Sequence, residues 1–148
     1  MQPFPHRYSA SATGGPEGHV LLNAEGLPLL VSAPPVEFDG PGDLWSPETL
    51  VVSAVADCFV LTFRAIARLS KLPWTTLTCQ VSGTVDRIDR AAQFTALSMR
   101  ASLEVPEGAN EEQARRLLER AEQNCLITRS LKASCELDVV VRVVQPAL

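Results

Sequence analysis

The chain has 148 residues and a mass of 16.0 kDa, with 46% hydrophobic and 20% charged residues. This composition is that of an ordinary globular protein and argues against disorder. The formal net charge is −4 and the isoelectric point lies near 5.2, so the chain lacks the basic excess with which proteins bind nucleic acid. We expect one domain over residues 1–148 and no nucleic-acid partner.

Location and metal binding can also be addressed from the sequence. The most apolar segment, residues 50–69, is interrupted by Asp57, Arg64 and Arg68, so we expect no membrane span. The first residues lack the basic and apolar regions of a secretory signal, which predicts a cytoplasmic protein. The cysteines form no CxxC pair and both histidines lie near the N-terminus, so we expect no metal site.

The N-terminal third is rich in turn-forming residues. Residues 1–46 contain seven of the eleven prolines and six of the eight glycines, which predicts short strands joined by turns. The apolar or β-prone runs are 8–13, 19–22 and 27–32, and glycine-containing turns separate them. We therefore expect a β-meander within residues 1–45.

A long central helix is predicted over about residues 47–70. Ser46 is a favourable N-cap, Pro47 suits the first helical position, and Glu48 favours the positive end of the helix dipole. The helix would be roughly 33 Å long at about 1.5 Å per residue. Apolar residues occupy nearly all of its faces, and such a helix must be buried all round. Because a chain this short can hardly enclose it, we expect a partner subunit.

The remaining elements complete an α+β pattern. Asn110 is a candidate N-cap for the second helix, and Gln113 completes a capping box with it. The order of strands, helix, strands, helix and strand predicts an α+β domain with antiparallel sheets. The expected elements are a β-hairpin over about 75–105, with its turn at 90–92, a second helix over about 111–124 and a C-terminal strand over about 133–144.

The four cysteines fall into two groups. Cys79 and Cys135 lie on the apolar phase of their expected strands, which is typical of unreactive core cysteines. Cys58 lies in the middle of the central helix, and Cys125 follows the second helix at a break. From these positions alone, Cys58 is either a buried hydrophobic residue or a reactive thiol.

Three segments carry a resemblance to a known family. Residues 46–59 combine a Pro-Glu-x-Leu helix start with Cys58, ten residues after Glu48, and residues 124–131 surround Cys125. Together with residues 8–15, they resemble the motifs of the OsmC/Ohr family of thiol peroxidases, and the resemblance spans about residues 8–144. It implies an OsmC-like α+β fold in which two subunits intertwine and antiparallel sheets enclose the long central helix.

The resemblance also implies a chemistry. Cys58 would be the peroxidatic thiol that attacks an organic hydroperoxide, and Cys125 would resolve its sulfenic acid as a disulfide. An external dithiol reductant would then regenerate the enzyme, without a bound cofactor, in an antioxidant stress response. Glu48 would complete the site, and since ten helical residues separate it from Cys58 by about 15 Å, it would do so in the partner subunit. Its alternative role is to stabilise the helix N-terminus.

The sequence departs from the family pattern at three positions. Pro16 follows the Gly-Gly pair where the Ohr branch has an arginine, Leu126 replaces a proline, and Asp57 adjoins Cys58. Arg129 and, second, Arg7 are the candidates to replace the missing cation. One alternative hypothesis is therefore a catalytically weak homodimer that binds a small apolar ligand in its interface pocket. Another is an interaction dimer without a ligand.

Overall fold

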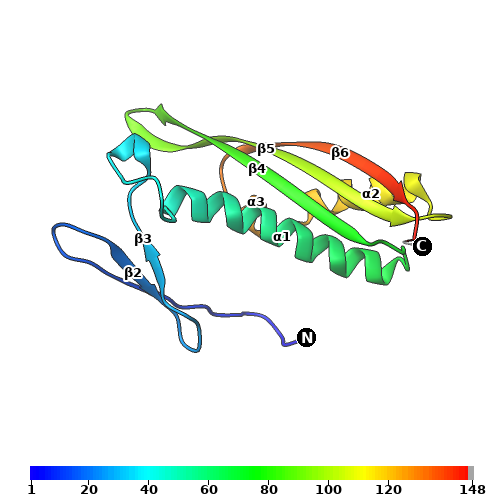
Figure 1. Cartoon of the computed structure of the whole chain (residues 1–148), viewed down its shortest axis with the longest axis horizontal. Coiled ribbons are helices and arrows are strands. Elements are labelled where there is room, and N and C mark those ends of the chain that lie inside the picture. The colour runs from blue at the N-terminus through cyan, green and yellow to red at the C-terminus, as the bar shows by residue number, and fades with distance from the viewer. Residues whose placement is uncertain (147–148) are drawn as a thin grey trace. The chain divides into compact units, whose positions relative to one another are not determined.

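The computed structural model describes residues 1–146 and consists of two compact units, one from Met1 to Val51 and one from Val52 onward. The N-terminal unit contains a three-stranded antiparallel sheet in the order β1-β2-β3, in the segment where the sequence predicts a β-meander. Its elements are β1 (Ser11–Thr13), β2 (Val20–Asn23), β3 (Leu30–Ser32) and the short 3-10 helix η1 (Val36–Phe38) (Figure 1).

Helix α1 (Pro47–Leu69) begins and ends at signals present in the sequence. The Ser46 hydroxyl accepts a hydrogen bond of 3.1 Å from the backbone N–H of Thr49, as an N-cap does. After the last turn, Lys71 adopts a left-handed conformation with φ 55°, and Leu72 donates its N–H to the Ala67 carbonyl at 3.0 Å. This geometry satisfies carbonyls that the helix end would otherwise leave unpaired.

The second sheet belongs to the C-terminal unit and has the order β4-β5-β6. Strands β4 (Thr76–Ile88) and β5 (Ala91–Pro106) form an antiparallel hairpin. Its two turn residues, Asp89 and Arg90, both have positive φ, at 49° and 69°. Two such residues match the right-handed twist of the flanking strands. The turn therefore begins one residue earlier than the predicted range 90–92.

The expectation of purely antiparallel sheets is wrong for the last strand. Strand β6 (Ser134–Val144) pairs with β5 in parallel, with Leu97 opposite Cys135. Between them the chain forms α2 (Glu111–Gln123) and the five-residue helix α3 (Leu126–Ser130). A helical crossover returns the chain to the end of the sheet from which β5 started, so the two strands run in the same direction.

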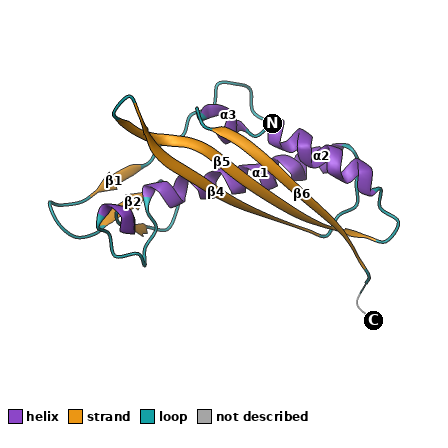
Figure 2. Ribbon diagram, turned by 90° about the horizontal axis from the view of Figure 1, so that it is seen from above, coloured by secondary structure: helices purple, strands orange, loops and turns teal. Residues whose placement is uncertain are grey.

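The core of the C-terminal unit lies between the second sheet and the helices. Figures 1 and 2 show α1 and α2 on the same face of β4, β5 and β6. The face of α1 with its buried residues carries Val55, Phe59, Phe63 and Ala67. On the opposite side of the helix, Leu61 is 49% exposed. A single chain thus buries α1 along one face only, and the all-round burial expected from its sequence is not reached within it.

Helix α2 is capped as predicted on one side of its capping box. The Asn110 side chain accepts a hydrogen bond of 2.9 Å from the backbone N–H of Gln113. The Gln113 side chain, however, donates to the Ser70 carbonyl at 3.4 Å. The second half of the box is therefore replaced by a contact that ties the start of α2 to the end of α1.

Helix α1 has the length and apolar composition of a membrane-spanning helix, in contrast to the expectation from its charged residues. Core helices of soluble proteins meet the same criterion. Here the side chains of Phe59 and Phe63 are completely buried against the rest of the C-terminal unit, while 22% of the most apolar stretch of the helix is buried within the single chain.

Candidate functional site

Two cysteines that are distant in sequence lie side by side in the C-terminal unit. Cys58 belongs to the middle of α1, and Cys125 is the N-cap of α3. The Cys125 thiol hydrogen-bonds to the Cys58 sulfur, and its Sγ also lies 3.9 Å from the Val55 carbonyl oxygen. Both are free thiols in this structure. The fold thus brings together the two cysteines that the sequence motifs single out.

The surroundings of Cys58 favour its thiolate. Partial burial raises the pKa of Cys58, but hydrogen bonds outweigh this effect and hold the pKa below its usual value. The donors are the backbone N–H of Ile127, the Cys125 thiol, the Thr62 hydroxyl at 3.9 Å and the backbone N–H of Leu126. A thiolate is the nucleophilic form of cysteine, so Cys58 is poised to attack an electrophile.

The other three thiols are held in the protonated form. Burial raises the pKa of Cys125 and the adjacent Cys58 raises it further, which together outweigh the lowering effect of Thr128. Burial likewise raises the pKa of Cys79 to about 12 and that of Cys135 to about 11. Of the four cysteines, only Cys58 therefore has a lowered pKa.

A groove of about 540 Å³ opens beside Cys58. Its walls are mainly apolar, and its residues are Ala54, Asp57, Cys58, Leu61, Thr62, Ala65, Leu126 and Ile127. A volume of this size suits a small organic molecule. Asp57 is exposed at this groove.

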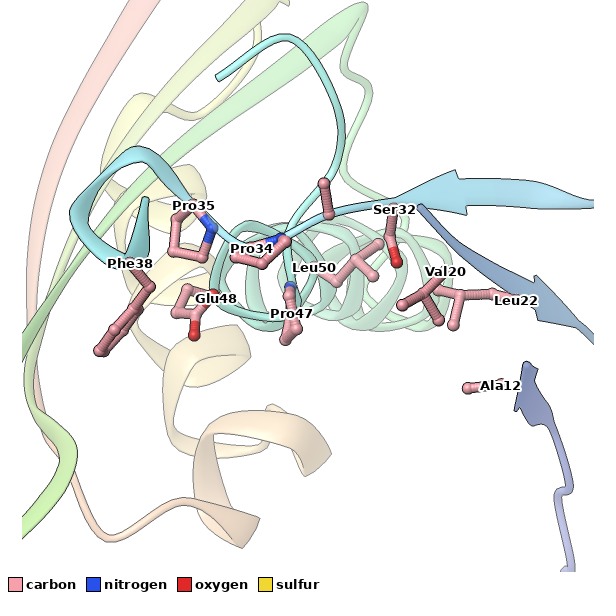
Figure 3. Close-up of a pocket in the computed structure, with 11 residues that line it drawn as sticks. Ala12, Val20, Leu22, Ser32, Pro34, Pro35, Phe38, Pro47, Glu48 and Leu50 are labelled. Carbon is pink, nitrogen blue, oxygen red and sulfur yellow. The ribbon is translucent and has the colours of Figure 1, made fainter. Parts of the chain in front are cut away.

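The remaining predicted site residues lie elsewhere. Arg129 is exposed in the last turn of α3, and Arg7 is exposed in the segment before β1. Glu48 lies in the first turn of α1 and lines a second cavity, of about 460 Å³, whose residues all belong to the N-terminal unit (Figure 3). The roles of these three residues stay predictions.

Sequence reasoning missed the donors around Cys58. Thr62 follows Cys58 by four residues, which places both on one face of α1, and this spacing could have identified it. Leu126 occupies the position of the family proline. Because proline has no N–H, the leucine adds a donor to the Cys58 sulfur. Nothing in the local sequence indicates that the start of α3 faces the middle of α1.

The fold and the site together define an α+β protein with a paired-thiol centre, one thiol activated and one protonated. The sequence pattern of the family described as OsmC-like protein matches residues 40–140. The chain therefore belongs to the OsmC family, which confirms the resemblance to OsmC/Ohr proteins stated above.

Individual relatives agree with this assignment. The chain is 27% identical to the uncharacterized protein YmaD of Bacillus subtilis over 108 residues, 71% of this chain and 72% of that protein. It is also 27% identical to organic hydroperoxide resistance protein-like 1 of Staphylococcus saprophyticus, over 91% of this chain and 94% of the relative. An OsmC-like protein of unknown function from Vibrio cholerae has a similar structure, with a TM-score of 0.78, 16% identity, and coverage of 95% and 100%.

Proposed function

We propose that the protein is a thiol-dependent peroxidase that reduces organic hydroperoxides in an antioxidant stress response. The observation that carries the proposal is the lowered pKa of Cys58 next to the protonated thiol of Cys125, at an apolar groove. The relatedness to a protein named for organic hydroperoxide resistance supports the choice of substrate. The apolar walls favour a hydroperoxide with an organic body over strongly hydrated hydrogen peroxide.

The reaction would proceed in two steps. The Cys58 thiolate attacks the distal oxygen of the hydroperoxide, the O–O bond breaks, and the leaving alkoxide takes a proton to give an alcohol and a Cys58 sulfenic acid. The Cys125 sulfur, after loss of its proton, then attacks the sulfenic sulfur, which forms the Cys58–Cys125 disulfide and releases water. A dithiol reductant returns both cysteines to thiols.

Peroxide consumption by thiol variants tests the first step. Cumene hydroperoxide is mixed with the protein and dithiothreitol, and its loss is followed for wild type, Cys58→Ser and Cys79→Ser. The proposal expects turnover to disappear in Cys58→Ser and to persist in Cys79→Ser, whose thiol has a raised pKa. Equal turnover in wild type and Cys58→Ser, above the rate without protein, would show that Cys58 is not the nucleophile.

Peptide mapping tests the second step. After one equivalent of hydroperoxide, the mapping should find a disulfide between Cys58 and Cys125, with Cys79 and Cys135 still reduced. In Cys125→Ser, the Cys58 sulfenic acid should persist and react with dimedone. A link between Cys79 and Cys135 instead would contradict the proposed pairing.

We further propose that two copies of the chain form an obligate homodimer. The exposed apolar side of α1, with Leu61 49% exposed, supports this, because exposed apolar surface of a helix is stabilised by burial. Sedimentation at micromolar concentration should give a mass of about twice the 16.0 kDa of one chain. A stable, folded monomer would exclude the dimer.

Glu48 is proposed to act on the thiol site of the partner subunit, because a continuous helix separates it from Cys58 of its own chain by about 15 Å. A crystal structure of the dimer tests this. If Glu48 lies farther than about 8 Å from both Cys58 sulfurs, beyond the few ångströms over which a charge shifts a thiol pKa, only its stabilising effect on the helix N-terminus is left.

The cellular setting follows from the same chemistry. We propose a cytoplasmic protein, because reducing compartments keep free thiols reduced and supply dithiol reductants. Subcellular fractionation with an antibody tests this, and recovery in the membrane fraction would contradict it.

A further inference from the structure

Thr128 carries a buried hydroxyl next to the pair of thiols. It is the third residue of α3, and 8% of its surface is exposed. Its Oγ1 atom is buried and has no hydrogen-bond partner in the part of the chain that the structure describes. An unpaired buried hydroxyl costs free energy, and native proteins contain few of them. The hydroxyl is therefore available to a group that becomes a stronger acceptor during a reaction.

The Cys125 sulfur is the group that this hydroxyl can serve. Cys125 is the N-cap of α3, and side chains at the N-cap and at the third helical position lie close together. Burial raises the pKa of Cys125, and Thr128 opposes this effect because its hydroxyl can donate a hydrogen bond to the thiolate. A neutral thiol is only a weak acceptor. The Thr128 hydroxyl thus gains a strong acceptor when Cys125 loses its proton.

We propose that the Thr128 hydroxyl stabilises the negative charge that develops on the Cys125 sulfur in the resolving step. This inference rests on the proposed function. In that step the Cys125 sulfur bonds to the sulfenic sulfur of Cys58, the S–O bond breaks, and the leaving hydroxide combines with the proton that Cys125 loses, which gives water. The Thr128 hydroxyl keeps its own proton and donates a charge-assisted hydrogen bond. Because this bond strengthens as the charge develops, it speeds the step.

A mixed disulfide isolates this step without peroxide. One equivalent of dithiobis(nitrobenzoate) at mildly acidic pH reacts with the Cys58 thiolate, releases one thionitrobenzoate and leaves the other on Cys58. The Cys125 thiolate then attacks the Cys58 sulfur, which forms the Cys58–Cys125 disulfide and releases the second thionitrobenzoate. The absorbance of this anion follows both phases. Cys79 and Cys135, with pKa values raised to about 12 and about 11, stay protonated and react slowly.

Three variants test the hydroxyl itself. Thr128→Val replaces it by a methyl group and should leave the first phase unchanged. The second phase should be slower on the order of 10-fold, which is the effect of losing a hydrogen bond to a charged group. Thr128→Ser keeps the hydroxyl and should restore the second phase. The matched control Ser130→Ala removes an exposed hydroxyl of the same helix, which donates to the Leu126 carbonyl, and should alter neither phase.

Two further measurements separate this role from a structural one. The second phase becomes faster with rising pH as Cys125 loses its proton, and in Thr128→Val this profile should move to higher pH, because Thr128 lowers the pKa of Cys125. Cys58 carries no charge in the mixed disulfide, and the other thiols that act on Cys125, those of Cys79 and Cys135, stay protonated. The urea midpoint of Thr128→Val should not fall, because an unpaired buried hydroxyl adds no stability.

Three outcomes would overturn the inference. They are a second phase of equal rate in wild type and Thr128→Val, a slower phase that Thr128→Ser does not restore, and the absence of a second phase in wild type. In the last case Cys125 does not attack Cys58 at all. Failure of the proposed function has a different sign, because wild type would then consume no hydroperoxide while the two phases still report on Thr128.

Discussion

The two units of the chain bury very different amounts of apolar surface. In the C-terminal unit, large side chains such as Phe59, Phe63 and Met99 are almost completely inaccessible to solvent. In the N-terminal unit the buried residues are small, namely Ser32, Ala33 and Ser46, whereas Phe38 is 58% and Trp45 43% exposed. The C-terminal unit therefore has a hydrophobic core of its own, and the N-terminal unit has apolar side chains without one.

The unit with the hydrophobic core is also the unit that contains the reactive thiol. The activated thiol needs donors held within a few ångströms, and Cys58 lies on the helix that packs into the core. Such precision requires elements whose side chains are locked by packing. The N-terminal unit instead exposes large apolar side chains, which is typical of a surface that binds a partner.

The largest expected effect is on the free energy of unfolding, when one phenylalanine from each unit is replaced by alanine. Phe59→Ala creates a cavity in the core and should lower the free energy of unfolding by about 3–5 kcal/mol. Phe38→Ala removes an exposed ring and should cost about 0.5 kcal/mol. Urea denaturation measures both. A cost for Phe38→Ala as large as that for Phe59→Ala would break the comparison, because it would mean that Phe38 is buried in the solution assembly.

The second prediction concerns the positive charge near the Cys58 thiolate, which Pro16 cannot provide. It distinguishes an arginine of the C-terminal unit from one of the N-terminal unit. If Arg129 has replaced the family arginine, Arg129→Ala should raise the pKa of Cys58 and lower peroxide turnover by about 10²-fold. The matched variant Arg7→Ala should then have little effect. Thiol titration and steady-state turnover measure both quantities. The reverse result would assign the role to the N-terminal unit, and no change in either variant would remove both arginines from the mechanism.

Two glycines test how each unit accommodates a crowded backbone. A Cβ on Gly40 would lie 1.6 Å from the Pro34 carbonyl oxygen, whereas a Cβ on Gly83 would first meet the Phe94 ring, at 2.6 Å. Side chains can shift more easily than backbone, so Gly40→Ala should cost about 3 kcal/mol and Gly83→Ala about 1 kcal/mol. Thermal unfolding measures both. A larger loss for Gly83→Ala would show that the turn at Gly40 is easily remodelled.

The smallest effect concerns pH and belongs to the core of the C-terminal unit. Folding raises the pKa of Cys79 from 9.0 to about 12, so ionisation favours the unfolded chain. Its contribution to stability is fully present below pH 9 and is lost as the pH rises from 9 to about 12. The urea midpoint of wild type should therefore fall more than that of Cys79→Val between about pH 8 and about pH 10.5. Parallel curves for the two proteins would contradict this.

The local elements and the family were accessible from the sequence alone. The helix over 47–69 follows from the Ser46 cap, the absence of glycine and proline after Pro47, and the stop near Pro73. The Asn110 cap likewise marks α2. These signals act between residues within one or two turns of each other, so they are present in any short window of the chain. The two cysteine motifs sufficed to recognise the OsmC family.

Only the tertiary structure determines how β6 pairs with β5 and how reactive the Cys58 thiol is. The parallel pairing of β6 with β5 depends on the crossover through α2 and α3, which no local sequence pattern specifies. The lowered pKa of Cys58 depends on the N–H groups of Leu126 and Ile127, which are distant from Cys58 in the sequence and close to it in the fold. A hydrogen bond acts over about 3 Å in space regardless of separation along the chain. The identity of the thiols was therefore readable in the sequence, and their reactivity only in the folded chain.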